Sequence, residues 1–290
     1  MSRARRWSGP LAALVVAAPM LSGCGALIDR ATSNFAADLE QAVVNYDEPM
    51  IVERGLPTFL LILEARLQAN PGNARTRLTT AELTGTYAGL FAEQPQRQRR
   101  LATRALDHAR RGACDAVAAL CRIDDGDFEA FEARLQELPT AAVDEAYVLG
   151  TVWAAWIAAS SDDFRALADL PRVEALLEWV AERDPNHDDG AVWLYLAVLN
   201  SQRPPAAGGR PDLAREQFER ARRISQGRNL LIPVLMADEY ARLMFDRDLF
   251  VELLEGVRDA DPQQDGYVLA NRIAQQRARD LLDQTSRIFD

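Results

Sequence analysis

The chain has 290 residues, 48% of them hydrophobic, and a net charge of −10 at pH 7. This length and apolar content are enough for a large core in one or two domains. Every basic residue is an arginine and no basic block follows the first residues, which argues against nucleic-acid binding. Three cysteines are too few for a disulfide-rich scaffold.

The first residues predict an export signal that ends in a lipidation site. Three arginines precede an apolar segment at 11–21, as in secretory signals. Leu21-Ser22-Gly23-Cys24 resembles a bacterial lipobox, which implies cleavage before Cys24 and acylation of its thiol and its new amino group. The alternative is an ordinary signal followed by a structural cysteine.

These features divide the chain into a signal peptide at 1–23, a lipidated tether at 24–33 and a single helical domain at 34–290. The acyl chains would hold an acidic body at a membrane surface. Gly25 rather than Asp follows the cysteine, which by resemblance to known sorting rules favours the outer membrane of a Gram-negative bacterium. We therefore expect a lipid-anchored protein that faces the periplasm.

Apolar residues recur at helical spacing along the rest of the chain, and no stretch sustains the alternation of a strand. The first two helices are expected around Phe35 and Val52, the second with Pro57 as a kink or a start. Breaks are clearest at 70–73 and in the Pro/Gly-rich segment 203–210. The further helices are expected at 73–91, 96–119, 128–138, 146–160, 173–181, 190–200, 211–225, 231–244, 247–258 and 267–288.

The uncharged stretch 146–160 predicts a helix at the centre of the fold, because a helix that is apolar all round must be buried on all sides. It is too short to span a bilayer. Small residues form one stripe at Gly150, Ala154 and Ala158, where a neighbouring helix can approach closely. The aromatic side, with Trp153, is either plain core or the wall of an apolar cavity.

Two degenerate helical hairpins match the tetratricopeptide (TPR) pattern. Trp193-x2-Leu196 fits its first helix and Ala214-x3-Phe218 its second. The same halves recur one repeat earlier, at Leu149-Gly150-x2-Trp153 and Ala175-x3-Trp179. We therefore expect an all-α, TPR-like α-solenoid of about 11–13 helices in stacked antiparallel pairs, with a concave face.

A distributed pattern in the chain also carries a family resemblance. Its main segments are Gly208-Gly209-Arg210-Pro211, Ala214-Arg215-Glu216-Gln217-Phe218-Glu219-Arg220-Ala221, Asn229, Ala237, Tyr240-Ala241, Phe245-Asp246-Arg247-Asp248-Leu249-Phe250, Leu253-Leu254 and Asn271-Arg272-Ile273-Ala274-Gln275. Gly55-Leu56-Pro57 and Asn70-Pro71 fit the pattern in the first half. Over roughly 51–289 the chain resembles the T-component family of TRAP transporters, often called TatT.

The resemblance implies a periplasmic, lipid-anchored, TPR-like solenoid that forms a homotrimer. It also implies a hydrophobic ligand cleft or pore in each subunit and small hydrophobic or organic-acid ligands. The implied partner is the TRAP substrate-binding protein, the P-component. The family has no settled catalytic residues, so none is assigned, and no cofactor is expected.

Large aromatic side chains are the candidates for lining an apolar cavity, because their rings offer apolar area with a polar handle. These candidates are Trp153, Trp156, Tyr87, Trp193 and Tyr240. The alternative for each is an ordinary place in the core.

Cys114 and Cys121 are seven residues apart. On one continuous helix their Cα atoms would be about 10.5 Å apart, beyond the reach of a disulfide. A bridge therefore requires the helix to break at about 117–120, and the sequence leaves both a bridge and two free thiols open.

The remaining polar motifs have ordinary readings. His187-Asp188-Asp189 suggests either a metal ligand set or the polar start of a helix, which we favour. The acidic run at 124–127 lacks the spacing of a calcium loop and reads as a turn. The other histidine, His108, has no companion nucleophile motif, so no catalytic set is assembled and no metal site is assigned.

The leading hypothesis is therefore a lipid-anchored helical-repeat component of a TRAP uptake system, which binds an apolar ligand and docks the substrate-binding protein. The alternative is a TPR-like scaffold lipoprotein for outer-membrane or cell-wall assembly. An enzyme is the least favoured class, because it would need a polar cluster in a cleft that the sequence does not supply.

Overall fold

The computed structural model describes residues 41–201 and 209–289, and within those ranges every regular element is helical. The lipobox with Cys24, the predicted tether and most of the first expected helix lie outside the described residues. The helices are α2 (Pro49–Ala69), α3 (Ala74–Phe91), α4 (Pro95–Ala116), η1 (Ala118–Leu120), α5 (Phe128–Gln136), η2 (Thr140–Ala142), α6 (Val143–Ala158), α7 (Phe164–Leu167), α8 (Leu170–Arg183), α9 (His187–Ser201), α10 (Pro211–Ile224), α11 (Leu231–Leu235), η4 (Met236–Ala241), α12 (Arg247–Asp259), α13 (Val268–Leu282) and α14 (Thr285–Phe289).

The predicted all-α, solenoid-like fold is confirmed, and most expected helices lie where the periodicity placed them. Several boundaries differ from the expectation. Pro57 does not start a helix but lies inside α2. The helix expected at 96–119 ends at Ala116, and the one expected at 267–288 is divided into α13 and α14. The helix expected at 231–244 is divided into α11 and the π-helical turn η4.

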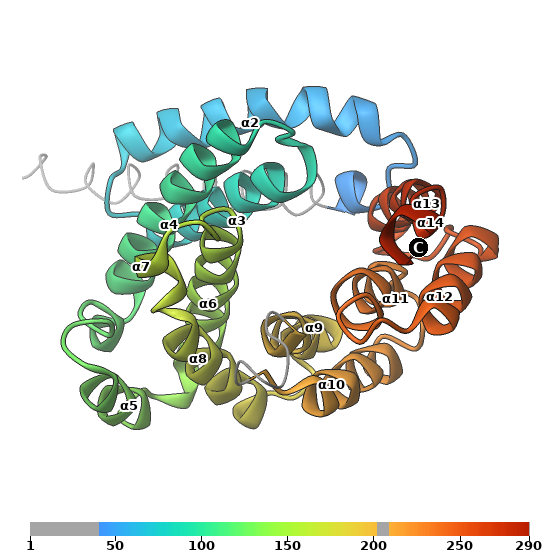
Figure 1. The fold of residues 1–290 in the computed structure, drawn as a ribbon. Coiled ribbons are helices and arrows are strands. Elements are labelled where there is room, and N and C mark those ends of the chain that lie inside the picture. The colour runs from blue at the N-terminus through green and yellow to red at the C-terminus, as the bar shows by residue number, and fades with distance from the viewer. Residues whose placement is uncertain (1–40, 202–208, 290) are drawn as a thin grey trace, which may run out of the picture.

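The helix pairs follow one another around a ring (Figure 1). In that view α3, α4, α6 and α8 form one side, α9 and α10 the lower edge, and α11 to α14 the other side. The long helix α2 crosses the remaining edge and contacts both sides of the ring. Its residues Val52 and Leu56 share an apolar cluster with Tyr87 of α3 and with Leu269 of α13. The expected concave superhelix is therefore closed by its first long helix.

Hydrogen bonds reinforce this closure. The side chain of Asn45, just before α2, donates to the carboxylate of Asp265 at 3.0 Å and accepts the backbone N–H of Gly266 at 2.7 Å. These partners are more than 200 residues apart along the chain. The Asn45 amide is paired through both its nitrogen and its oxygen, which fixes the orientation of the side chain. The segment before α2 is therefore held against the segment before α13.

The central helix α6 lies in the largest apolar cluster, which runs from α3 to α9. At Gly150 the close approach is confirmed, because an added Cβ would lie 2.7 Å from a methyl carbon of Leu177 in α8. Burial on all sides is wrong for the last turn, where Ala158 is exposed and Trp156 is partly exposed. The helix ends at Ala158, so this turn has fewer helices around it.

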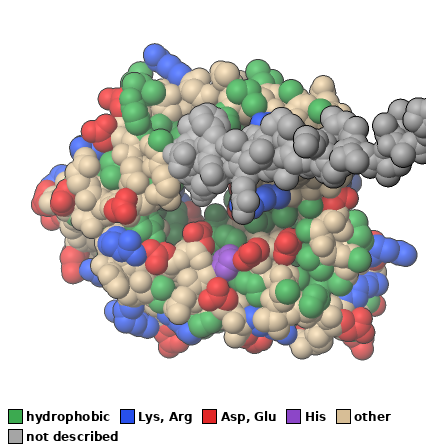
Figure 2. All heavy atoms as spheres, turned by 180° about the vertical axis from the view of Figure 1, so that it is seen from behind, with side chains coloured by type: hydrophobic (Ala, Val, Ile, Leu, Met, Phe, Trp, Pro, Cys, Tyr) green, Lys and Arg blue, Asp and Glu red, His purple; other side chains and the backbone are tan. Residues whose placement is uncertain are grey.

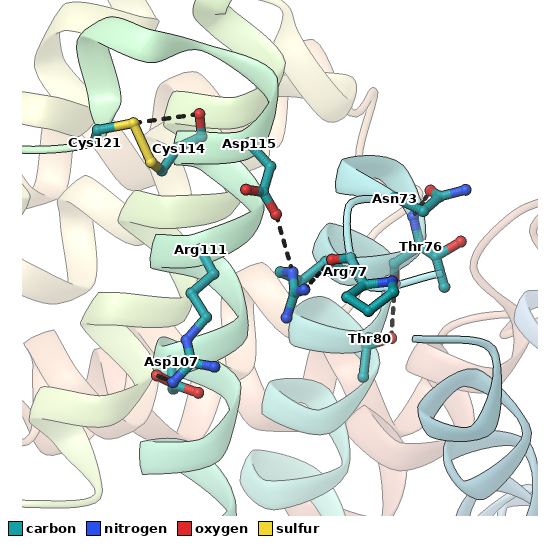
Figure 3. A network of polar contacts seen from close by, with 10 residues as sticks. Asn73, Thr76, Arg77, Thr80, Asp107, Arg111, Cys114, Asp115 and Cys121 are labelled. Atoms are coloured by element: carbon teal, nitrogen blue, oxygen red, sulfur yellow. Dashed lines mark hydrogen bonds and ion pairs between the residues drawn. A yellow bond between two sulfur atoms is a disulfide. The ribbon is translucent and has the colours of Figure 1, made fainter. Parts of the chain in front are cut away.

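Helices α3 and α4 pack closely against each other in the region shown in Figure 3. A Cβ on Gly112 would lie 2.9 Å from Cγ of Leu78, so glycine is required by the contact. Arg77 of α3 donates to Asp115 of α4 at 3.2 Å, and Asn73 caps α3 by accepting the Thr76 N–H at 2.9 Å.

Cys114 and Cys121 form a disulfide, with their Cα atoms 4.1 Å apart (Figure 3). The required break is present: α4 ends at Ala116, and Val117 takes extended backbone angles before the 3-10 turn η1. The disulfide therefore joins the end of α4 to the turn that leads toward α5.

Candidate functional site

The ring surrounds a hollow that opens on the face shown in Figure 2. Hydrophobic side chains are visible in its wall, and acidic side chains gather with a histidine at one edge. Such a mixture of apolar wall and few polar groups is typical of small-molecule sites.

The backbone at the start of α9 is unusual. Asp188, Asp189 and Gly190 have consecutive positive φ values of 48°, 54° and 82°. For a residue with a Cβ this left-handed conformation is uncommon and costs free energy. Glycine is required at position 190 for two reasons. Its φ is positive, and an added Cβ would lie 2.8 Å from the Cβ of Ile224 in α10.

Side chains from distant elements hold this turn. Tyr147 of α6 donates its hydroxyl to Asp188 at 2.7 Å, and Tyr267, the residue before α13, donates to Asp189 at 2.7 Å. The guanidinium of Arg228, which precedes α11, also donates to Asp189. We call these five residues the tyrosine–aspartate cluster; they join both sides of the ring to α9 and offset the cost of the left-handed turn.

Electrostatics keep the tyrosine hydroxyls protonated. Burial and the neighbouring Tyr195 and Asp188 raise the pKa of Tyr147 well above its usual value. Desolvation, with smaller effects of Asp188 and Glu82, raises the pKa of Tyr195 to about 12. The pKa of Tyr267 is raised by desolvation and by its bond to Asp189. The hydroxyls are therefore protonated at neutral pH, and those of Tyr147 and Tyr267 donate hydrogen bonds to Asp188 and Asp189.

His187 contacts this cluster from the side. Its ring meets the edge of the Tyr147 ring with centroids 4.5 Å apart, and its Nδ1 lies 3.3 Å from a carboxylate oxygen of Asp184. In the described part of the chain, no three His, Cys, Asp or Glu side chains are placed to hold a metal ion. The prediction that His187-Asp188-Asp189 is the polar start of a helix is confirmed, since α9 begins at His187, although Asp188 and Asp189 take left-handed backbone angles that the sequence analysis did not predict.

The aromatic candidates from the sequence are not brought together. Trp153 is 1% exposed in the main core and donates to Asp169, while Trp156 is partly exposed and donates to Thr103. Tyr87 is buried in the cluster that closes the ring. Tyr240 is buried in a third cluster, with Phe218 and Met236.

Trp193 is the candidate that reaches an open surface. It lines a groove of about 290 Å³ between α9 and α10, with its indole N–H bonded to the Pro185 carbonyl at 2.7 Å. The guanidinium of Arg220 lies 3.7 Å from the ring centroid, a cation–π contact. A role of these five aromatics in ligand binding stays a prediction.

The tyrosine–aspartate cluster was missed by sequence reasoning. The available signal was Asp-Asp-Gly at 188–190, since Asp and Gly enter the left-handed region more readily than other residues. Its partners Tyr147 and Tyr267 are distant in sequence, and no local pattern connects them.

Comparison with known proteins agrees with this architecture. The family model described as "TRAP transporter T-component" matches residues 45–289. An uncharacterized protein of Treponema pallidum (strain Nichols) is 24% identical over 244 residues, covering 78% of this chain and 76% of that protein. The match spans almost all described helices, so the chain belongs to the T-component family of TRAP transporters.

Proposed function

We propose that this protein is a lipid-anchored accessory component of a TRAP uptake system that binds a small hydrophobic or organic-acid ligand in the hollow of the ring. The single observation that carries the proposal is the closed helical ring around a hollow with an apolar wall (Figure 2). Family membership gives the transport context.

The proposed location is the periplasmic side of the outer membrane. The lipobox at Cys24 and the disulfide between Cys114 and Cys121 support export, because disulfides persist in oxidising compartments. Among the described residues, no helix is long and apolar enough to cross a bilayer. In this proposal the acyl chains on Cys24 are the attachment, and the part from 34 to the C-terminus is one helical-repeat domain.

The proposed partner is the substrate-binding protein of the TRAP system, docked on a homotrimer of this chain. Direct contact would let ligand pass between two proteins without dilution into the periplasm. In the alternative, a scaffold for envelope assembly, the hollow would stay without a small ligand and the partners would be envelope proteins.

The test uses the mature lipidated chain in detergent. Binding to a TRAP substrate-binding protein from the same organism is measured by calorimetry, and ligand binding by tryptophan fluorescence during titration with aliphatic and aromatic carboxylic acids. We expect saturable binding in both assays. Trp193→Phe tests whether the ligand reaches the groove between α9 and α10, and Trp179→Phe, at a side chain 2% exposed in the core, is the control. A fluorescence change that is lost only in Trp193→Phe would assign the ligand to that groove.

No association with the substrate-binding protein and no saturable ligand would contradict the proposal. Capture of envelope assembly proteins instead, with an empty hollow, would favour the scaffold.

A further inference from the structure

Helix α2 has two apolar faces, and only one of them is covered. Its inward face closes the ring through Val52, Leu56, Leu63 and Leu67, all buried. Its opposite face carries four further large apolar side chains that are exposed. These are Met50 at 52%, Ile51 at 56%, Leu61 at 71% and Ile62 at 50% exposure.

Smaller residues complete this opposite face without adding negative charge. Gly55, Thr58 and Ala65 are exposed between the large apolar side chains. Together with the four residues above and Arg54 they form what we call the outer α2 face. A contiguous apolar surface of this kind on a soluble body marks an interaction site.

The charge on this face is opposite to that of the protein. Exposed Arg54 lies within it and exposed Arg66 follows near its end. The two acids of α2, Glu53 and Glu64, are partly buried away from it, and Glu64 accepts from Arg104 at 2.7 Å. A protein with a net charge of −10 thus presents here a surface that is apolar and cationic.

The position of the face in the chain limits what can cover it. The predicted acylation site, Cys24, is 17 residues before the first described residue, Gln41. A segment of that length reaches at most about 60 Å. In the described part of the chain, α2 is the first long helix after the predicted acylation site, and its outer face lies within reach of the membrane to which the anchor would attach.

We propose that the outer α2 face lies on the membrane surface, with its apolar side chains at the headgroup boundary and Arg54 near anionic headgroups. The proposal rests on the lipid anchoring proposed above. Amphipathic helices bind bilayers in this way, through apolar area on one side and basic residues for anionic lipid. The ring would then stand with α2 against the bilayer and with α5 and α10 on the side away from it (Figure 1).

A second copy of the chain fits this face less well. In a two-fold contact the same patch meets itself, so Arg54 of one copy would face the like-charged patch of the other. In the proposed homotrimer the contact would be heterologous, and a neighbouring copy that covers the face would shield it from iodide without quenching by nitroxide lipids. Anionic lipid supplies the missing negative charge.

The test reads the environment of α2 in the full mature chain, anchored in vesicles of phosphatidylethanolamine and phosphatidylglycerol. Ile62→Cys is labelled with an environment-sensitive fluorophore; with Cys24 acylated and the other two cysteines bridged, the new thiol is the only free one. The matched control is Phe164→Cys on α7, a side chain 86% exposed. Aqueous iodide and nitroxide-labelled lipids serve as quenchers.

We expect the label at position 62 to be quenched by nitroxide lipids and shielded from iodide, and the label at position 164 to behave in the opposite way. Arg54→Gln should lower the ratio of lipid-contacting to free α2 by about fivefold in anionic vesicles, and not in neutral vesicles.

Three outcomes contradict the inference. Equal iodide quenching at both labels means that α2 stays in water. Shielding from iodide without quenching by nitroxide lipids means that protein, such as a second copy, covers the face. A chain that does not float with vesicles and carries no acyl mass on Cys24 contradicts the anchoring itself, which separates this failure from the other two.

Discussion

The two sides of the ring are held together by different chemistry. From α3 to α9 one continuous apolar cluster contains Trp153, Phe131 and Leu177, with a disulfide at its edge. From α9 to α14 the core is divided into two smaller clusters. Buried amide side chains supply much of the order between them, notably Asn271 at 0% and Gln275 at 7% exposure.

These amides satisfy backbone groups where the helices separate. Asn271 accepts the Leu230 N–H at 2.9 Å and donates to the Arg228 carbonyl at 2.9 Å. The side-chain nitrogen of Gln275 donates to the carbonyl groups of Val257, Arg258 and Ala260 at the end of α12, the nearest, Ala260, at 2.9 Å. The comparison teaches that the first side depends on packed apolar area, whereas the second depends on a few polar side chains that no apolar residue can replace.

The largest expected effect on the second side comes from Phe218, one of its large buried aromatic rings. Phe218 is 0% exposed among residues of α9, α10 and η4. Phe218→Ala should lower the free energy of unfolding by about 3–5 kcal/mol, through lost burial and a cavity. Urea denaturation measures the loss. The exposed Phe164→Ala should change little, and an equal loss in both variants would show that Phe218 is no core residue.

The disulfide should contribute next, and on the first side alone. Replacing Cys114 and Cys121 by serine removes a short cross-link, with an expected loss of about 2.5 kcal/mol from the unfolded-chain entropy that it restores. Urea midpoints of wild type and variant, each with and without a reductant, give the value. A wild type that is insensitive to reductant would contradict the bridge.

A smaller loss is expected from a single polar change on the second side. Asn271→Leu keeps the volume roughly constant but leaves the Leu230 N–H and two carbonyl groups without their partner. The expected cost is about 1–3 kcal/mol, the penalty for buried groups without hydrogen bonds. Calorimetric melting measures it. A neutral result would show that water replaces the amide and would weaken the comparison.

The sequence predicted the helices better than their closure. Apolar spacing located α3, α6 and α10, and Gly150 correctly marked a close helix contact. Spacing cannot show which distant surface a helix face will meet, so the second contact of Val52 and Leu56, with Leu269, was not foreseen. Likewise the end of α4 at Ala116, which permits the disulfide, is not marked by a proline or glycine at Val117 or in the residues that follow it.

The candidate site was less predictable still, for a related reason. The aromatic side chains chosen from the sequence were large and apolar, and such residues fill cores as readily as cavities. Trp153 lies in the core, whereas Trp193 lines a groove. The cluster that spans the ring consists of hydroxyl and carboxylate pairs, and only the folded chain brings those groups together.

The smallest expected effect tests the joint between the two sides. Tyr267→Phe removes the hydroxyl that bonds Asp189 and leaves the ring in place, at a site that is only partly buried. We expect a loss of about 1 kcal/mol, because Arg228 still pairs with the carboxylate. The matched control is Tyr195→Phe. The hydroxyl of Tyr195 forms no hydrogen bond to another described residue, so its loss should be nearly neutral.

Amide hydrogen exchange should show faster opening at the start of α9 in Tyr267→Phe alone. Unchanged exchange there would mean that the left-handed turn needs only Tyr147 and Arg228, and that the two sides are joined through α2 rather than through α9.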